Sequence, residues 1–195
     1  MAASLPLLVS LMAAGYLSGS GLAALAVCRV AGVPDPRLAG SGNPGFANVL
    51  RLYGRRLALA TLAIDVVKGM PVLWLAMTLG LPPWALGLVG FGVLLGHACP
   101  VWHRFRGGKG VASALGVMLV LTPGVALCCA ALWLLLAWRL RTAAVASLAS
   151  AVLAPLVSLW LAPAFAGVLA AFTLLVTVRH VLNIRRLGRG DEPSL

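Results

Sequence analysis

Long apolar runs separated by short polar connections dominate the chain from end to end. The runs fall at residues 4–27, 57–79, 83–98, 110–122, 124–138, 143–160 and 164–180. A helix needs about 20 apolar residues, with a usual range of about 17–25, to cross the hydrocarbon core of a bilayer. The run at 110–122 falls short of that range, and we expect it to be tilted or re-entrant. The pattern predicts an all-α polytopic membrane protein with about seven transmembrane helices.

Composition supports this assignment and limits the number of domains. Of the 195 residues, 62% are hydrophobic and only 10% are charged. A soluble domain of this size needs a more highly charged surface to stay in solution, so the surrounding solvent is expected to be lipid. The spans use up most of the chain and leave no room for a separate soluble domain. We expect a single integral membrane domain over residues 1–195.

Basic residues alternate with the apolar runs. They occur in the connections at 28–56, 97–109, 139–141 and 179–189, whereas the connections near 81–83, 122–124 and 160–164 carry none. Every Lys and Arg except Lys68 therefore falls on one side of the predicted bundle. Short loops rich in Lys and Arg stay in the cytoplasm. The sequence predicts an N-terminus outside, a C-terminus inside and a cytoplasmic face that carries the polar loops.

The net charge of +11 narrows the classes of partner. An excess of Lys and Arg on a membrane protein attracts anionic headgroups and anionic substrates. Nucleic acid is not expected, because the sequence has no basic helix and no aromatic stacking platform. Cys99 lies between His97 and His103, but too few further ligands are near for a metal site, so no metal is expected.

Asp65 and Lys68 are the charged residues within the second run, and their spacing puts them on one face of a helix. A charge inside the bilayer costs a few kcal/mol or more, so the two are expected to pair. The pair can lock its helix to the bundle, or Asp65 can orient a cation of the active site. We favour the structural role.

The first basic connection contains a glycine-rich loop that reads Gly40-Ser41-Gly42-Asn43-Pro44-Gly45 and continues to Asn48 and Arg51. Glycines allow backbone N–H groups to turn inward, which makes a nest for phosphate. Ser41 and Asn43 add neutral donors, and Arg51 adds a fixed fork of N–H donors. A simple turn that caps an interfacial helix explains the glycines, but it leaves Asn43, Asn48 and Arg51 without a role.

The second glycine-rich loop follows His97 and places Gly107, Gly108 and Gly110 around Lys109, at the start of an apolar helix. Backbone donors, a helix N-terminus and an ammonium then converge on one spot, as anion binding requires. The loop is not a nucleotide P-loop, because no Ser or Thr follows the lysine.

The third polar connection begins at the end of the last apolar run. His180 and Asn183 are three residues apart on one face of a helix end, among several arginines and upstream of Glu192. A single His among arginines is more often an interfacial residue than a catalyst. Its place on the same side as the two glycine-rich loops favours a chemical role.

These three stretches resemble, in the same order, the three motifs of the bacterial acyl-phosphate:glycerol-3-phosphate acyltransferases, the PlsY family. The first family motif runs Gly-Ser-Gly-Asn-(Ile/Pro)-Gly-Ala-Thr-Asn-Val-Leu-Arg, the second contains Phe-(Arg/Lys)-Gly-Gly-Lys-Gly-Val-Ala-Thr, and the third contains Arg-His…Asn-Ile-(Arg/Lys)-Arg-Leu. The resemblance covers almost the whole chain. Two departures are that Phe46-Ala47 replaces Ala-Thr, which brings an aromatic ring beside the expected phosphate site, and that Ser113 replaces Thr.

The resemblance implies transfer of an acyl group from acyl phosphate to the sn-1 hydroxyl of glycerol 3-phosphate, giving lysophosphatidic acid, in the bacterial cytoplasmic (inner) membrane. It implies no cofactor, no metal and no obligate protein partner beyond membrane lipid. The expected catalytic residues are Ser41, Arg51, Lys109, His180 and Asn183. The expected phosphate-binding residues are Gly40, Gly42, Asn43, Gly45, Asn48, His97, Gly107, Gly108 and Gly110, and the expected structural residues are Asp65, Lys68 and Glu192. Either His180 or the substrate phosphate takes the hydroxyl proton, and the sequence does not choose between them.

Four other classes of membrane protein fit the sequence less well. Other glycerol-3-phosphate acyltransferases use a His-x4-Asp dyad, and no histidine of this chain has an Asp at that spacing. A CDP-alcohol phosphotransferase needs clustered acids for metal ions, whereas Asp65 is the one acid within an apolar run. A transporter has its polar site near the bilayer midplane, and a scaffold does not need three anion-binding loops.

Overall fold

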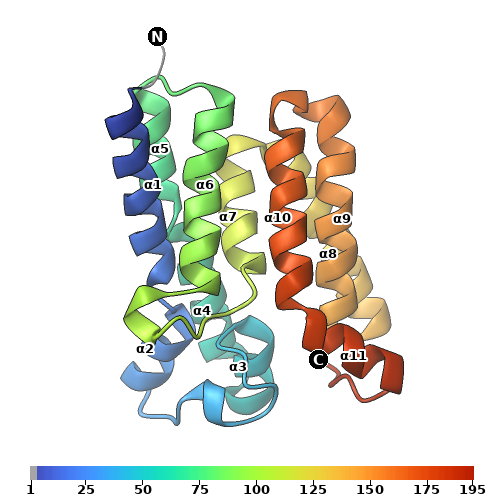
Figure 1. Ribbon diagram of the computed structural model, residues 1–195. Coiled ribbons are helices and arrows are strands. Elements are labelled where there is room, and N and C mark those ends of the chain that lie inside the picture. The colour runs from blue at the N-terminus through green and yellow to red at the C-terminus, as the bar shows by residue number, and fades with distance from the viewer. Residues whose placement is uncertain (1–3) are drawn as a thin grey trace.

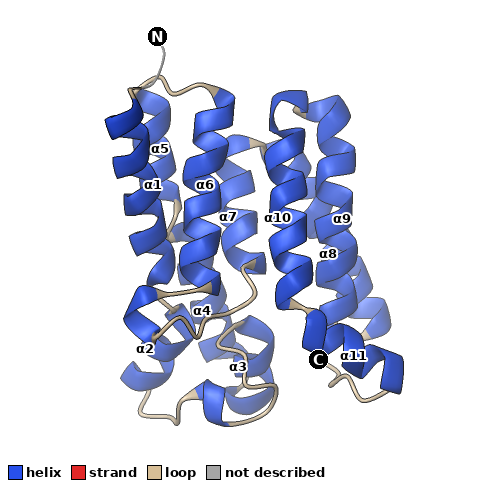
Figure 2. Ribbon diagram, viewed as in Figure 1, coloured by secondary structure: helices blue, strands red, loops and turns tan. Residues whose placement is uncertain are grey.

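The computed structural model describes residues 4–195 as a bundle of α-helices, and the described residues contain no strand (Figure 2). The helices are α1 (Leu5–Ser20), α2 (Ala23–Val30), α3 (Phe46–Tyr53), α4 (Arg55–Val67), α5 (Met70–Thr78), α6 (Pro83–Ala98), α7 (Val111–Leu121), α8 (Pro123–Leu140), α9 (Ala143–Leu161), α10 (Ala166–Arg179) and α11 (Val181–Arg189). The long helices run side by side, while α2, α3 and α11 gather at one end of the bundle (Figure 1). The all-α prediction is confirmed.

The predicted count of about seven spans is not confirmed. Five helical segments of residues 4–195 are long and apolar enough to cross a membrane, and the bent pair at 163–189 makes a sixth if it counts as one span. The predicted run at 110–122 corresponds to α7, which has 11 residues. At about 1.5 Å per residue such a helix is too short to cross the hydrocarbon core alone. The protein is therefore multi-pass, with five or six candidate spans and one short apolar helix.

Two predicted runs are interrupted, and the interruptions face each other. The run at 4–27 breaks between α1 and α2 at Gly21, and the run at 57–79 breaks between α4 and α5 at Lys68. Each break frees backbone carbonyl groups that need a partner in a low-dielectric environment. The Lys68 ammonium donates to the Gly21 carbonyl at 2.9 Å, and the Ser18 hydroxyl donates to the Lys68 carbonyl. Side chains at or near each break thus donate hydrogen bonds to a backbone carbonyl group at the other break.

Helices α1 and α6 approach closely because glycines line their contact. A Cβ atom on Gly19 would lie 2.1 Å from the carbonyl oxygen of Val93, and one on Gly96 would lie 2.0 Å from that of Tyr16. Gly15 and Gly92, each four residues earlier, are packed in the same way. Small residues four apart are the usual means by which membrane helices pack backbone against backbone. The contact holds α6 in place, and α6 carries His97 at its end.

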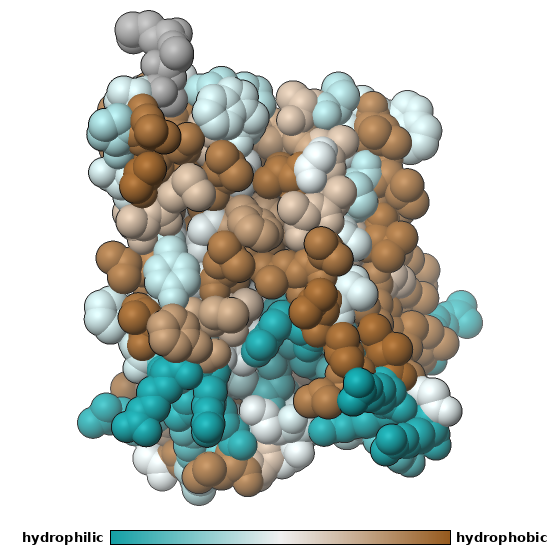
Figure 3. All heavy atoms as spheres, in the orientation of Figure 1, coloured by the Kyte–Doolittle hydropathy of each residue, from teal (hydrophilic) through white to brown (hydrophobic). Residues whose placement is uncertain are grey.

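Hydrophilic side chains gather at the end that carries α2, α3 and α11, below a broad apolar surface (Figure 3). The N- and C-terminal ends of the described chain lie at opposite ends of the bundle in Figure 1. All three glycine-rich or basic connections therefore lie at one end, as the charge alternation predicted.

Candidate functional site

The first loop is held in shape by the side chain of Asn48, which is buried at the start of α3. Its Oδ1 accepts from the backbone N–H of Ser41 at 2.9 Å, and its Nδ2 donates to the carbonyls of Pro36 at 2.8 Å and Ala39 at 3.2 Å. Gly40 has a left-handed φ of +60°, and a Cβ there would lie 2.4 Å from Asn48 Oδ1. The amide of Asn48 is thus used to fold the loop, and Ser41 and Asn43 remain at the cavity wall.

The second loop packs against the end of α6. A Cβ atom on Gly107 would lie 2.1 Å from the His97 carbonyl oxygen, and one on Gly108 would lie 2.2 Å from His97 Nε2. Arg179 at the end of α10 donates to the carbonyls of Gly108 at 3.0 Å and Gly107 at 2.8 Å. The glycines are therefore needed for close approach, and Arg179 ties this loop to the third polar connection.

A buried cluster lies behind the second loop. Lys68 Nζ is 2.8 Å from Asp65 Oδ1 and 2.8 Å from His97 Nδ1, and all three side chains are almost fully buried. An ammonium can only donate, so Nδ1 of His97 accepts and its proton is on Nε2, toward Gly108. The expected Asp65–Lys68 pair forms, and His97 joins it. Because a buried charge without a partner is strongly destabilising, the cluster fixes α4, α6 and the loop together.

His180 lies at the 57° bend between α10 and α11, Asn183 lies in the first turn of α11, and both side chains are buried. His180 Nδ1 lies 2.8 Å from the carbonyl of Val176. A carbonyl only accepts, so Nδ1 carries the proton and Nε2 keeps a free lone pair. Asn183 Nδ2 donates to Glu192 Oε1 at 2.5 Å. The bend thus presents one basic nitrogen and one oriented amide.

Arg51 reaches from α3 to the segment after α11. Its Nε donates to the carbonyl of Ser194 at 2.7 Å, and its Nη2 donates to that of Pro193 at 3.2 Å. A guanidinium has five N–H donors, so these two contacts leave three for another acceptor. The segment at 190–195 therefore closes one side of the site.

Lys109 is a strongly perturbed cation at the loop end of the bundle. Burial lowers its pKa to about 8, Glu192 opposes the shift, and Arg51, Arg186 and Arg179 lower the pKa further. Loss of hydration and repulsion by three guanidinium groups both disfavour the ammonium. A bound anion would relieve both effects, which is the electrostatic character of an anion site.

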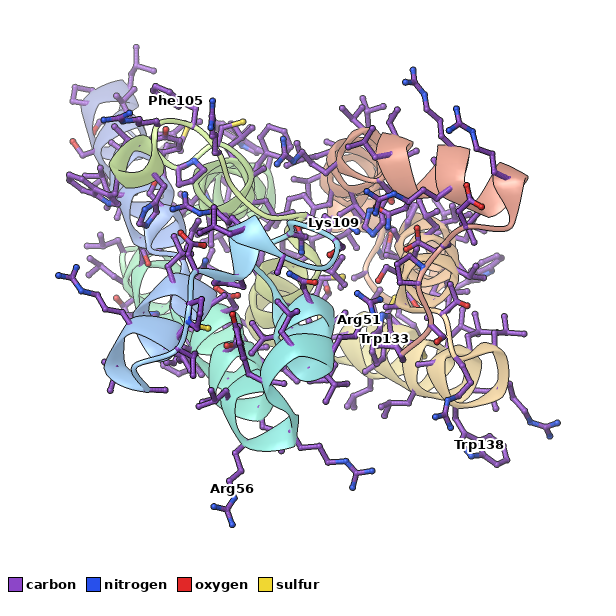
Figure 4. The ribbon with its side chains drawn as sticks, turned by 90° about the horizontal axis from the view of Figure 1, so that it is seen from below. Arg51, Arg56, Phe105, Lys109, Trp133 and Trp138 are labelled. Atoms are coloured by element: carbon purple, nitrogen blue, oxygen red, sulfur yellow. The ribbon has the colours of Figure 1, made fainter. Side chains whose placement is uncertain are left out.

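One cavity of about 420 Å³ connects the three loops. Its polar end is formed by Ser41, Asn43, Gly45, Asn48, Arg51, Asp65, His97, Lys109, Gly110, His180, Asn183 and Glu192. Its apolar end includes Phe46, Leu59, Leu62, Leu115, Ala130, Trp133 and Leu134. Viewed from the loop end of the bundle, Arg51, Lys109 and Trp133 lie toward the middle of the molecule, whereas Arg56, Phe105 and Trp138 lie at its rim (Figure 4).

All five predicted catalytic residues line this cavity. Of the predicted phosphate-binding residues, Asn43, Gly45, Asn48, His97 and Gly110 line it, whereas Gly40, Gly42, Gly107 and Gly108 do not. Their roles stay predictions. Sequence reasoning gave no role to Arg179, to Trp133 or to the segment at 193–194. The position of Arg179 directly before His180 could have indicated a role for it. Nothing in the local sequence indicated a role for Trp133 or for the segment at 193–194.

Comparison with known proteins identifies the family of the chain. The family model for glycerol-3-phosphate acyltransferase matches residues 9–190. The chain belongs to the glycerol-3-phosphate acyltransferase family. A glycerol-3-phosphate acyltransferase of Chromohalobacter salexigens is 59% identical over 195 residues, which cover 100% of this chain and 95% of the relative.

Two crystal structures of PlsY (YgiH), an integral membrane glycerol 3-phosphate acyltransferase, have the same fold. The glycerol 3-phosphate form superposes with a TM-score of 0.90 at 32% identity and covers 96% of this chain and 95% of that chain. The lysophosphatidic acid form superposes with a TM-score of 0.88 at 31% identity, with the same coverage. The resemblance of the three motifs to the PlsY family is confirmed, and the chain is an integral membrane acyltransferase that acts on glycerol 3-phosphate.

Proposed function

We propose that the acyl donor is an acyl phosphate, and that residues 1–195 act as one membrane domain that transfers its acyl group to the sn-1 hydroxyl of glycerol 3-phosphate. The products are 1-acyl-glycerol 3-phosphate (lysophosphatidic acid) and inorganic phosphate. The observation that carries the proposal is the single cavity that has cations at one end and apolar side chains at the other. An acyl phosphate has a phosphate, a reactive carbonyl and a fatty chain in that order, and the cavity offers matching surfaces.

The chemistry needs little beyond positioning and charge neutralisation. The glycerol oxygen attacks the acyl carbon, the bond between that carbon and the phosphate oxygen breaks, and the phosphate leaves with the electron pair. Arg51 and Lys109 neutralise the leaving phosphate, and Ser41, Asn43 and loop N–H groups hold phosphate oxygens. Gly45 lines the cavity and is placed to contribute to this role, whereas Gly40 and Gly42 act through the shape of the first loop. Asn48, His97, Gly107 and Gly108 act by holding the two loops.

Two proton acceptors are compatible with the geometry. His180 Nε2 has a free lone pair at the cavity, and the leaving phosphate is itself a base. If His180 is the base, the variant His180→Ala loses kcat with little change in KM for glycerol 3-phosphate. If phosphate takes the proton, the same variant chiefly raises KM, because only orientation of the hydroxyl is lost.

The location of the site follows from charge. We propose that the end carrying the basic connections is cytoplasmic, in the bacterial inner membrane, because loops rich in Lys and Arg stay inside. The PlsY structures in glycerol 3-phosphate and lysophosphatidic acid forms support the identities of the acceptor and the product. No cofactor is proposed.

The proposal is tested with protein purified in detergent. Palmitoyl phosphate and palmitoyl-CoA are each offered together with glycerol 3-phosphate, and the acylated product is analysed for sn-1 or sn-2 attachment. We expect the 1-acyl product when palmitoyl phosphate is the donor and no product when palmitoyl-CoA is the donor. Equal turnover of palmitoyl-CoA, or attachment at sn-2, would overturn the proposal.

A further inference from the structure

Phe46 and Trp133 contact each other at the wall of the cavity. Phe46 is the first residue of α3, the helix that also carries Arg51. Trp133 lies on α8 beside Leu134, which belongs to the apolar wall. Both rings line the cavity, and their centroids are 6.2 Å apart with an interplanar angle of 70°. This is an edge-to-face contact that joins α3 to α8.

The Trp133 ring is held in place by a hydrogen bond to a neighbouring helix. Its Nε1–H donates to the Ser147 hydroxyl of α9 at 3.0 Å, so the indole has one preferred orientation. Phe46 follows Gly45 of the glycine-rich loop, and that loop is fixed through Asn48. The Trp133 ring is therefore anchored by its hydrogen bond, and the Phe46 ring is held by its backbone position and by its contact with Trp133.

The apolar end opens sideways next to this pair. Leu59 of α4 and Leu134 of α8 line the cavity and yet are 58% and 64% exposed, so the cavity reaches the outer apolar surface between these helices. Lys109 and the two rings line the same cavity, so we take a donor chain in that opening, with its acyl carbon near Lys109, to pass the rings with its first few carbons. Smaller side chains at these positions would leave that passage wider.

We propose that the Phe46–Trp133 pair is a specificity-determining element that selects acyl donors whose carbons next to the carbonyl are unbranched, and that it positions the acyl carbon for attack. The inference rests on the proposed function, because it takes the donor chain to occupy the apolar end. Aromatic surface contributes by packing on methylene groups, and a methyl branch at carbon 2 would collide with anchored rings. The pair acts on the donor and leaves the glycerol 3-phosphate site untouched.

The test compares palmitoyl phosphate with 2-methylpalmitoyl phosphate. For Phe46→Ala and Trp133→Ala we expect KM for palmitoyl phosphate to rise roughly two- to tenfold, the fold-change that corresponds to losing an aromatic contact. We expect the preference for the unbranched donor to fall by a similar factor and KM for glycerol 3-phosphate to stay unchanged. The double variant is expected to lose less than the two single losses combined, because both remove the same contact.

Two milder variants test the donor preference with less risk of disturbing the fold. Phe46→Leu fills most of the ring's volume and is expected to show an intermediate loss of preference, and Ser147→Ala frees the indole and is expected to act in the same direction more weakly. Trp138→Ala is the matched control, because Trp138 lies on the same helix, stacks on Arg139 and does not line the cavity. An unchanged donor preference in both Phe46→Ala and Trp133→Ala, or an equal change in Trp138→Ala, would overturn the inference.

A failure of the acyl phosphate assignment can be distinguished from a failure of the inference about the Phe46–Trp133 pair. The branched-to-unbranched ratio is measured with whichever activated acyl donor the wild-type protein turns over. If acyl phosphate is not used but acyl-CoA is, the proposed function fails while the 2-methyl comparison, made with acyl-CoA, still decides the role of the pair.

Discussion

Asn183 donates a hydrogen bond to Glu192 at 2.5 Å, and this bond fixes the orientation of the Asn183 amide inside the cavity. With Nδ2 directed to the carboxylate, Oδ1 is left free to accept a hydrogen bond from a substrate hydroxyl. The other carboxylate oxygen, Oε2, is buried, and no group within residues 4–195 hydrogen bonds to it. Glu192 therefore links the third motif to the cations of the site, and its charge opposes the lowered pKa of Lys109.

Removing the Glu192 carboxylate is expected to reduce activity through Asn183. A hydrogen bond to a charged group contributes about 1.5–3 kcal/mol, so Glu192→Ala should lose roughly 10- to 150-fold in kcat/KM. Glu192→Gln still presents an acceptor oxygen and should lose less. The measurement is kcat/KM per folded molecule, with Tm recorded for each variant. If both variants lower Tm but keep wild-type kcat/KM, Glu192 is structural only.

The cations of the cavity are expected to dominate catalysis. Loss of a charge-assisted bond to phosphate should cost roughly 2–4 kcal/mol, or about 30- to 1000-fold in kcat/KM, in Arg51→Ala and in Lys109→Ala. Arg51→Lys should recover little, because a point charge does not replace a planar fork of donors. Arg56→Ala is the matched control, since this arginine is exposed at the rim (Figure 4). Equal activity in all of these variants would contradict the site assignment.

The depressed pKa of Lys109 predicts a dependence on pH. The free enzyme holds a charged ammonium below pH of about 8 and loses that charge as pH rises through this value. KM for palmitoyl phosphate should therefore rise above pH 8, because Lys109 contacts the donor phosphate and a singly substituted phosphate is already doubly charged above its second pKa of about 6. Lys109→Arg, whose charge does not titrate, should remove this rise. A flat KM between pH 7 and 9.5 in the wild-type enzyme would contradict the account.

Sidedness can be measured by labelling single cysteines in a background without the four native ones. Cysteine at Ala164, an exposed residue between α9 and α10, should react with an impermeant reagent from outside intact cells. Cysteine at Gly188, an exposed residue of α11, should react only after permeabilisation. Reaction of the Gly188 variant from outside would reverse the proposed orientation.

Much of this architecture was predictable because the bilayer constrains sequence strongly. Apolar runs fixed the long helices, and prolines such as Pro83 and Pro123 begin the next helix where the missing N–H is not needed. The breaks at Gly21 and Lys68 were not predictable, because each depends on donors from the other segment. Hydropathy alone counts such interrupted runs as simple spans, whereas the short length of the run at 110–122 already indicated that α7 is not an ordinary crossing.

The residues of the candidate site also divide into those that the sequence could predict and those that it could not. Ser41, Arg51, Lys109, His180 and Asn183 could be found because their residue types suit phosphate and proton chemistry in three separate connections. The role of Asn48 in folding the first loop could not be found, since a buried amide satisfied by backbone groups looks in sequence like an amide available for ligand. Contacts between distant segments, such as Phe46 with Trp133, leave no local pattern at all.

The central claim is acyl transfer from acyl phosphate with cleavage between the carbonyl carbon and the phosphate oxygen. The direct measurement uses palmitoyl phosphate with 18O at the bridging oxygen, incubated with purified enzyme and with or without glycerol 3-phosphate. We expect one labelled inorganic phosphate for each lysophosphatidic acid formed, and no phosphate without the acceptor. Label retained in palmitate, or phosphate released equally in the absence of glycerol 3-phosphate, would contradict the account.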